Sequence, residues 1–211
     1  MPEIRRRSDA VRNRARIVAA AVSAFDEVGP QLRLDDLAER AGVGVATVYR
    51  LFGSRDGLVQ AAFETVFGAE IEPLAQAARE APDPATGLRD VLGATLERVA
   101  AHRGLFRAAR ETGAVGVDIA ERYLRDLDDV LRAAQRAGAV RTDVALRDVA
   151  AVLVMVLAVV RDGDPDGADR RRYLSLLLDG LRPGAPALPP PAPGGWEPPV
   201  PPPRGECSPV G

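Results

Sequence analysis

Acidic residues gather in one stretch of the chain, where their spacing could support metal binding or acid–base catalysis. They are Glu121, Asp126, Asp128 and Asp129. On a helix, Asp126 and Asp129 share a face, and paired carboxylates can hold a cation or move a proton. Arg122 and Arg125 lie at salt-bridge spacing from these carboxylates. We therefore interpret the cluster as a solvated, self-neutralising helix face rather than a catalytic site.

Histidine and cysteine, which build many catalytic and metal centres, occur only once each in the 211-residue sequence. One histidine, His102, and one cysteine, Cys207, exclude a multi-histidine zinc site, a cysteine-based metal site and an intramolecular disulfide. His102 precedes Gly104 at an expected helix end, where it would serve as a partner of the helix dipole. The sequence contains no nucleophile motif and no glycine-rich phosphate loop. It therefore predicts no enzyme activity, no metal and no cofactor.

Apolar spacing predicts helices along nearly all of residues 10–182. Apolar residues recur at intervals of three and four, and no alternating strand pattern bounded by hairpin turns occurs. The predicted helices cover residues 10–28, with Ser8 or Asp9 as the cap, and residues 34–40, 45–51, 58–74, 86–103, 119–137, 143–160 and 169–181. Thr86 is expected to cap one of them, Gly104 to stop it, and Pro73 to kink or end the one before. The fold class is therefore all-α.

The stretch LDDLAERAGVGVATVYRLF, residues 34–52, has the residue types of a helix-turn-helix. Its first short helix turns Leu37 and Ala38 inward, and the small Ala38 permits a close helix crossing. Gly42 stands where the tight turn needs a residue without a side-chain penalty. The second short helix turns Val48 inward. A plain αα-hairpin also matches this pattern, so the surrounding sequence decides between the two.

Residues 14–59 resemble the N-terminal domain of TetR-family transcriptional repressors. The matching residues before the motif are Arg14, Ile17, Ala20, Ala21, Phe25 and Gly29. The segment TVYRLF at residues 47–52, followed by the helix start SRDGLV at residues 54–59, is highly specific to that family. The resemblance implies an N-terminal three-helix helix-turn-helix DNA-binding domain and a C-terminal helical domain for ligand binding and dimerisation. Residues 60–182 agree only in being helical and of suitable length.

The resemblance also implies which residues meet double-stranded operator DNA. These positions are Arg33, Gly44, Val45, Ala46, Thr47, Tyr49, Arg50 and Arg55. Thr47 and Tyr49 match positions that bond the DNA backbone, and Arg55 matches a basic residue that contacts phosphate. Arg50 faces the groove and suits guanine. The alternatives are core packing for Tyr49 and an uninvolved surface position for Thr47 and Arg50.

Two departures from the family pattern limit direct base readout. Val45 occupies a position that is often polar, and it offers only apolar contact, for instance with a thymine methyl group. Arg33 stands where Ser or Thr commonly caps the first helix of the motif, and arginine cannot make that cap. The backbone amide of Gly44 can still meet a phosphate at the helix N-terminus. Because Ala46 also lacks a hydrogen-bonding side chain, affinity is expected to rest mostly on phosphate contacts.

Positive charge collects at the N-terminal end, although the whole chain has a formal net charge of −2. Residues 1–60 hold ten arginines against eight acidic residues, and six of these arginines fall within residues 1–16. We expect residues 1–9 to form a flexible basic arm that enters a minor groove or binds phosphates. A solvated, charged terminus is the alternative.

In the family the C-terminal domain binds a small ligand between its helices. The corresponding candidates are Phe63, Phe67, Leu96, His102, Phe106, Tyr123 and Met155. Core packing is the alternative for each of them. Because few are polar, a small apolar or aromatic effector is expected. The second hypothesis is a DNA-binding regulator without an effector, whose C-terminal domain serves only dimerisation or the binding of a protein partner.

The last two predicted helices are apolar on more than one face. Residues 149–160 form an unbroken apolar run, and residues 169–181 are rich in leucine. A single chain of this size would struggle to cover both helices, so we expect a homodimer that reads a palindromic operator. The expected interface consists of Val149, Val152, Leu153, Val156, Leu174, Leu177, Leu178 and Leu181.

The chain ends in a stretch whose composition opposes folding. Residues 183–211 contain twelve Pro and five Gly, and such a segment cannot bury enough apolar surface to offset its ordering entropy. We expect a disordered tail and assign no role to Trp196 or Cys207. A ligand for a proline-recognising domain is the functional alternative.

The sequence thus predicts four segments and a location. The segments are a basic arm (1–9), the helix-turn-helix domain (10–56), a helical ligand-binding and dimerisation domain (57–182) and the tail (183–211). No secretory signal is seen, and the apolar run is shorter than the ~20 residues of a membrane span. We expect a cytoplasmic protein that does not enter the membrane.

Overall fold

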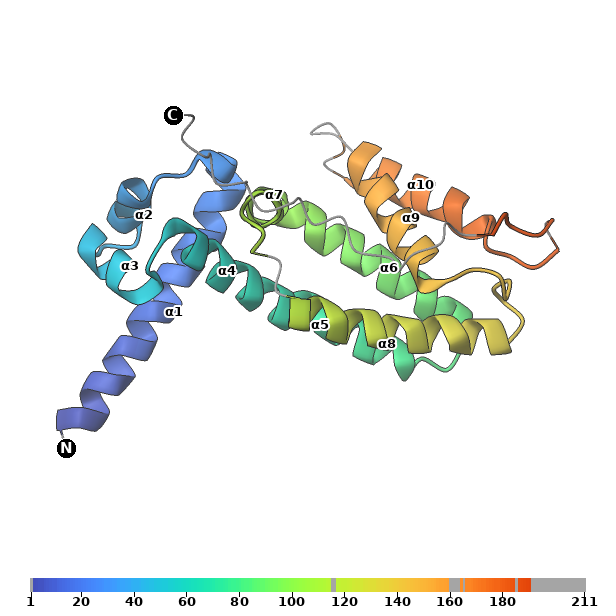
Figure 1. Ribbon diagram of the computed structural model, residues 1–211, viewed down its shortest axis with the longest axis horizontal. Helices are drawn as coiled ribbons and strands as arrows, with labels where there is room; N and C mark the ends of the chain where they lie inside the picture. Colours follow the sequence, from blue (N-terminus) through green and yellow to red (C-terminus); the bar gives the residue numbers. More distant parts are fainter. Residues whose placement is uncertain (1, 115–116, 160–163, 165, 185, 191–211) are drawn as a thin grey trace, which may run out of the picture. The chain divides into compact units, whose positions relative to one another are not determined.

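The computed structural model describes residues 2–114, 117–159, 164, 166–184 and 186–190, and all regular secondary structure in these residues is helical (Figure 1). The helices are α1 (Pro2–Val28), the 3-10 helix η1 (Gly29–Gln31), α2 (Leu34–Arg40), α3 (Val45–Phe52), α4 (Arg55–Val66), the π-helix η2 (Phe67–Ile71), α5 (Glu72–Arg79), α6 (Pro84–Ala101), α7 (Arg103–Thr112), α8 (Val117–Arg136), α9 (Leu146–Val159) and α10 (Ala168–Asp179). The predicted all-α fold is confirmed.

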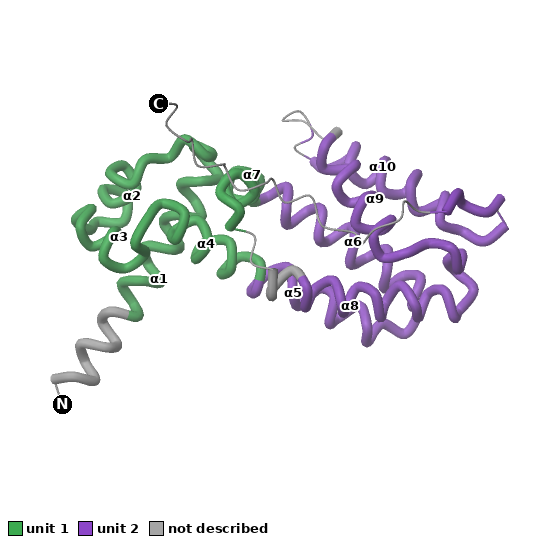
Figure 2. Tube along the Cα trace, in the orientation of Figure 1, with its two compact units in different colours: residues 1–67, 102–117, 198–211 green, residues 68–101, 118–197 purple. Residues whose placement is uncertain are grey.

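The chain forms two compact units (Figure 2). The first unit holds residues 1–67, 102–117 and 198–211, and the second holds residues 68–101 and 118–197. The predicted boundary between the DNA-binding domain and the C-terminal domain lies at residues 56 and 57. The structure instead groups α4 and α7 with the helix-turn-helix, because both helices pack against α1.

Helix α1 begins at Pro2 and continues to Val28, where Gly29 opens the 3-10 turn. The predicted helix end at Gly29 is confirmed, but the predicted separate arm at residues 1–9 is wrong for residues 2–9, which continue the helix. The reason is local. Pro2 is the first residue of the helix, where the amide would have no partner within the helix, so its absence carries no cost. The residues that follow in α1 include several good helix formers and no glycine.

The core of the first unit is built on one stripe of α1. Ile17, Ala21 and Phe25, each four residues from the next, are fully buried. Helix α7 crosses α1 so closely that a Cβ atom on Gly104 would lie 2.0 Å from the carbonyl oxygen of Phe25. Only glycine permits this approach, so Gly104 fixes where α7 meets α1.

Apolar spacing does not predict α7, and it predicts too late a start for α6. Gly104 was expected to stop a helix, but it lies inside α7. The helix before it begins at Pro84, and Asp83 caps it by accepting hydrogen bonds from the amides of Ala85 (3.3 Å) and Thr86 (3.0 Å). Thr86 is therefore not the cap. Its hydroxyl bonds to the carboxylate of Asp83 instead.

The second unit packs α6 against α5, α9 and α10. Helix α6 buries Leu88, Leu92 and Leu96, spaced four apart. The hydroxyl of Thr95 lies 2.7 Å from the phenol oxygen of Tyr123, and both side chains are buried. This bond satisfies two polar groups that would otherwise destabilise the apolar interior.

The carboxylates of α8 pair with arginines, as their interpretation as a self-neutralising face requires. Asp126 accepts a hydrogen bond from Arg79 of α5 at 2.7 Å, and Asp128 accepts one from Arg132 at 2.7 Å. Arg125 pairs with Glu121 as predicted, whereas Arg122 pairs with Glu72. Among the described residues, no group of His, Cys, Asp or Glu could hold a metal ion.

Two predictions concern parts of the chain that are described incompletely. Within the described residues, no helix is both long and apolar enough to cross a bilayer. Most of the predicted disordered tail, including Trp196 and Cys207, lies outside the described residues.

Candidate nucleic-acid interface

A tight turn joins α2 to α3. Gly42 has a φ of +63°, which lies in the left-handed region that favours glycine. The amide of Val43 donates to the carbonyl of Ala38 at 3.0 Å, which closes the end of α2. The side chains of Leu37, Ala38 and Val48 are buried between the two helices. The helix-turn-helix predicted from these residues is therefore present.

Helix α3 leaves one face open. Val48 is fully buried and anchors the helix, whereas Ala46, Tyr49 and Arg50 are exposed. These three residues are spaced three and four apart, so they share one side of the helix. Tyr49 is 52% exposed, so the alternative that it packs in the core is wrong. The face offers a phenol hydroxyl and a guanidinium group to a partner.

The first turn of α3 borders this open face. Gly44 is the N-cap residue, and no side chain caps the helix, so its first amides are not bonded by a capping group. Val45 and Thr47 are half-buried. At the start of α2, Arg33 is the N-cap and makes no side-chain cap bond, as expected. Its exposed guanidinium lies 3.9 Å from Asp35.

Two contacts lie where α3 ends and α4 begins. The guanidinium carbon of Arg14, on α1, lies 5.3 Å from the ring centre of Phe52. Ser54 caps α4 by accepting a hydrogen bond from the amide of Gly57 at 3.1 Å. A serine directly before the start of a helix is a local signal for this cap, because its side-chain oxygen can accept a hydrogen bond from an amide in the first turn. The Arg14–Phe52 contact joins distant segments and had no such signal.

Arg55 makes contacts within the protein that the resemblance does not imply. Its Nε donates to the carbonyl of Leu32 at 3.3 Å, and its Nη2 donates to the carbonyl of Pro30. The guanidinium carbon also lies 5.5 Å from the ring centre of Phe25. The side chain is 30% exposed. Arg55 therefore ties the start of α4 to the turn that precedes α2, whatever contact its remaining donors make.

Three of the predicted ligand-pocket residues form an aromatic cluster in the first unit. The ring centre of Phe63 lies 5.4 Å from that of Phe67 and 5.3 Å from that of Phe106. Phe63 and Phe67 are buried, and Phe106 is half-buried. The three rings pack against one another, which is the alternative of core packing that the sequence left open for them.

The other four predicted pocket residues do not share one environment. In the first unit, Nδ1 of His102 lies 2.7 Å from the carboxylate of Asp26. In the second unit, Leu96 and Tyr123 are buried, whereas Met155 is 48% exposed. Burial raises the pKa of Tyr123 to about 12. Leu96 and Tyr123 thus pack in the interior of the second unit, which is the alternative left open for them, and the role of the four residues in ligand binding stays a prediction.

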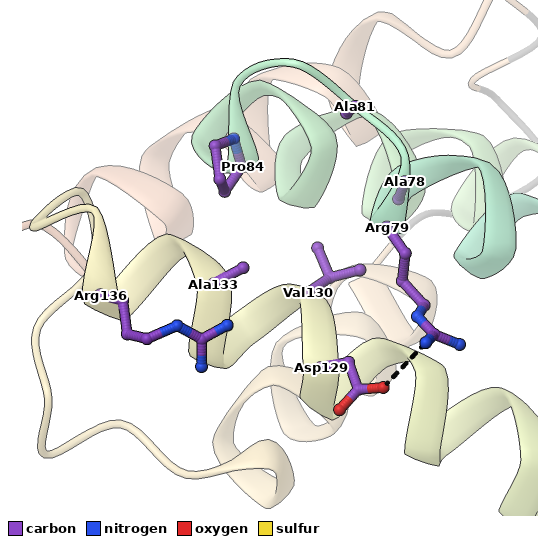
Figure 3. Close-up of a pocket in the computed structure, with 8 residues that line it drawn as sticks. All are labelled: Ala78, Arg79, Ala81, Pro84, Asp129, Val130, Ala133 and Arg136. Atoms are coloured by element: carbon purple, nitrogen blue, oxygen red, sulfur yellow. Dashed lines mark ion pairs between the residues drawn. The ribbon is translucent and has the colours of Figure 1, made fainter.

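The hollows described in the second unit have other linings. Figure 3 shows one of about 250 Å³, in which Val130 and Ala133 of α8 point toward the segment around Pro84. The Arg79–Asp129 ion pair, at 3.5 Å, lies at one end of it. A larger hollow of about 550 Å³ lies between the start of α6 and the end of α10.

The predicted dimer residues divide between core and surface. Val149, Val152, Val156 and Leu174 are buried by their own chain, so they form the interior of the second unit rather than an open surface. Leu153, Leu177, Leu178 and Leu181 are half-buried. Among the described side chains of α9 and α10, the large apolar ones that are exposed are Val154, Met155, Tyr173 and Leu176. Of the predicted interface residues, only the half-buried four keep surface for a second copy, and the interface itself stays a prediction.

Two family descriptions match the sequence. "Bacterial regulatory proteins, tetR family" matches residues 17–62, which include the helix-turn-helix. "Transcriptional regulator SbtR-like, C-terminal domain" matches residues 83–183. No protein with a curated description matches the chain.

Solved structures of regulators share the fold over most of the chain. A TetR transcriptional regulator from Streptomyces coelicolor is 32% identical with a TM-score of 0.61, over 82% of this chain and 99% of that one. A TetR transcription regulatory protein from Mycobacterium vanbaalenii is 33% identical with a TM-score of 0.58, over 83% and 98%. The regulator FadR from Bacillus subtilis, solved with stearoyl-CoA, is 20% identical with a TM-score of 0.62, over 81% and 98%, and shows likeness of fold alone.

Proposed function

Because this chain belongs to the TetR family of bacterial transcriptional regulators, we propose that it binds a palindromic DNA operator as a homodimer, represses transcription there, and is released by a small-molecule effector. Membership of this family makes it a DNA-binding regulator and not an enzyme. Its site of action is the cytoplasm, where bacterial operator DNA lies.

The observation that carries the DNA-binding proposal is the open face of α3. Ala46, Tyr49 and Arg50 are exposed on one side of this helix, and the fully buried side chain of Val48 packs into the core. A helix presented in this way fits the major groove, which is about 12 Å wide. Arg50 would read guanine with its fork of donors, and Tyr49 would donate to a phosphate.

Phosphate contacts supply most of the affinity in this proposal. Val45 and Ala46 have no hydrogen-bonding side chains, so few groups on α3 can read base edges. The amides in the first turn of α3, which follow Gly44 and have no side-chain cap, would donate to a phosphate, because helix N-termini attract anions. Thr47, Arg33 and the arginines of α1 would add contacts to the DNA backbone.

The homodimer would form through the exposed apolar face of α9 and α10. Leu176 is 68% exposed, and Val154, Met155 and Tyr173 are also open to solvent. Large apolar side chains that are exposed on two helices in contact with each other favour burial against a second copy. A two-fold dimer then presents two copies of α3 to two half-sites about one helical turn, ~34–36 Å, apart or slightly more.

Effector release would act through α4 and the π-helix that follows it. Helix α4 begins at the Ser54 cap beside the DNA-binding motif, and the chain passes from the first unit to the second after Phe67, the first residue of η2. A π-helix interrupts the regular hydrogen-bond ladder, so this segment is a natural pivot. A ligand that binds the DNA-incompetent form more tightly would lower operator affinity.

The second candidate is a regulator without an effector. The observation that favours it is the packing of the predicted pocket residues, since Phe63, Leu96 and Tyr123 are all buried. A thermal-shift screen against small apolar and aromatic compounds separates the two candidates, because a bound ligand stabilises the folded protein by mass action. A hit whose addition also weakens operator binding supports the effector, and a screen without one favours the second candidate.

Protection footprinting on genomic DNA fragments tests the DNA-binding proposal. The expected result is a protected palindrome whose isolated half-site binds far more weakly than the whole. The double variant Tyr49→Phe with Arg50→Ala serves as the matched control, because both side chains are exposed and their loss leaves the core intact. If wild type and this variant protect the same DNA equally, α3 is not the reading helix.

A further inference from the structure

A hollow of about 550 Å³ opens at the far end of the second unit, where the start of α6 faces the end of α10. Ligand sites in proteins commonly enclose 300–1,000 Å³, so the hollow has the volume of a small organic molecule. Its apolar lining includes Leu88 of α6, Val140 of the α8–α9 loop, and Leu178 and Leu181 at the end of α10. Leu88 and Val140 are buried and form a fixed floor.

The charged groups that line this hollow are both arginines, Arg89 and Arg182, and none of its lining residues is acidic. Arg89 is exposed and forms no ion pair with any described residue. Arg182 lies 3.0 Å from Asp179, and both side chains of that pair are exposed, so solvent weakens their attraction. The lining therefore combines an apolar floor with two guanidinium groups that can accept a further anionic partner.

One wall of the hollow is held in place by Arg141. The amide of Arg141 donates to the carbonyl of Leu181 at 2.9 Å. Its side chain, 9% exposed, donates through Nε and Nη2 to the two carboxylate oxygens of Asp143 at 2.6 and 2.7 Å. Nη2 also donates to the carbonyl of Pro186, and the amide of Leu188 donates to Asp143 at 2.9 Å.

These bonds secure both sides of the chain segment that contributes Leu181, Arg182 and Pro183 to the hollow. A wall fixed before binding costs a ligand little ordering entropy. The hollow is thus pre-formed, and it is distinct from the aromatic cluster around Phe63 in the first unit.

We propose that this hollow binds an amphipathic carboxylate, with an alkyl or aryl chain on Leu88, Leu178 and Leu181 and the carboxylate between Arg89 and Arg182. The apolar floor favours the chain through burial of its surface. The planar guanidinium groups match a carboxylate in both charge and geometry. A neutral chain would lack the second interaction, and a cationic one would be repelled.

Isothermal titration of the full chain with decanoate, in the absence of DNA, tests the site independently of operator binding. Decanoate is expected to bind saturably, more tightly than octanoate, by at most about fourfold for each methylene group. Decylammonium, which has the same chain and the opposite charge, is expected not to bind. The proposal is overturned if decanoate does not bind, as would follow if a second copy covers the hollow, or if decylammonium binds equally well.

Variants assign the binding to this hollow. The double variant Arg89→Gln with Arg182→Gln should weaken decanoate at least tenfold, whereas Arg136→Gln, an arginine beside the smaller hollow, should leave it unchanged. Ala139→Phe should block the site by filling it from the α8–α9 loop. Circular dichroism and thermal unfolding show that each variant is folded. Equal decanoate affinity in the double variant and wild type would place the site elsewhere.

Discussion

The Nε atom of Arg55 lies 3.3 Å from the carbonyl oxygen of Leu32, which places the first residue of α4 against the turn that leads into α2. The same guanidinium reaches the carbonyl of Pro30 and stacks beside Phe25. A side chain that bonds two backbone carbonyls from a distant segment fixes the position of the helix-turn-helix on its supporting helices. Arg55 is therefore a positioning residue as well as a candidate for phosphate contact.

The Arg55→Ala variant should lose stability as well as DNA affinity. Two carbonyls lose a charged donor, which costs about 1–3 kcal/mol. Denaturant unfolding measures this loss, and Arg55→Lys should recover only part of it because lysine lacks the planar fork. A variant with unchanged stability and a salt slope of DNA binding reduced by about one would show that Arg55 acts through phosphate alone.

Arg50 and Tyr49 should affect DNA binding in different ways. Removing the Arg50 side chain should relax discrimination at one base pair, at a cost of about 1–3 kcal/mol there. Tyr49→Phe should weaken binding to all sequences alike, because a phosphate contact carries no sequence information. Fluorescence anisotropy with the operator and its single-base variants measures both effects. Equal losses on operator and random DNA for Arg50→Ala would contradict its role in base reading.

Leu176→Arg should give a folded monomer. Leu176 is 68% exposed within one chain, so the substitution leaves the core intact but would bury an unpaired charge in the dimer, at a cost of roughly 3–5 kcal/mol. Light scattering measures the mass, and Leu188→Arg, at another exposed leucine, is the control. Val156→Arg should instead unfold the second unit, since Val156 is fully buried. A dimeric Leu176→Arg variant would exclude this face.

Gly104→Ala should destabilise the first unit, because the new methyl group would lie 2.0 Å from the carbonyl oxygen of Phe25. Overpacking of this kind costs about 1–3 kcal/mol or more. Gly93→Ala is the matched control within α6, where the new methyl group would meet only Leu174, at 3.7 Å. That variant should gain about 0.5–1 kcal/mol from helix propensity. Thermal unfolding measures the midpoint temperature of both variants. A shift of both midpoints in the same direction would contradict the prediction.

The buried Thr95–Tyr123 pair should make stability fall in strong alkali. Burial raises the pKa of Tyr123 to about 12, above its ordinary value of 10. The folded state therefore holds this proton more tightly, so the contribution is complete below pH 10 and is lost as the pH rises toward 12. The slope is at most about 1.4 kcal/mol per pH unit. The free energy of unfolding of the Tyr123→Phe variant should not fall in this way between pH 10 and pH 12. An identical fall in the variant would show that other groups cause the pH dependence.

The sequence alone determined the features that depend on neighbouring residues. The turn at Gly42, the inward side chains of Ala38 and Val48, and the helix end at Gly29 follow from local spacing and backbone preference, and each is present. The same locality explains why the helix-turn-helix and the exposure of Tyr49 and Arg50 on α3 could be foreseen. A short motif carries its own geometry, because α2 and α3 contact each other across a turn of only four residues.

The tertiary structure decided the features that depend on distant segments. Periodicity showed that α9 and α10 are apolar, but only their packing on α6 decided that Val156 is buried while Leu176 is exposed. The carbonyls bound by Arg55 and the place of Gly104 against Phe25 likewise join residues far apart in the chain. Side-chain type fixes what a residue can bond or bury, whereas its partner is chosen by the free energy of packing the whole unit.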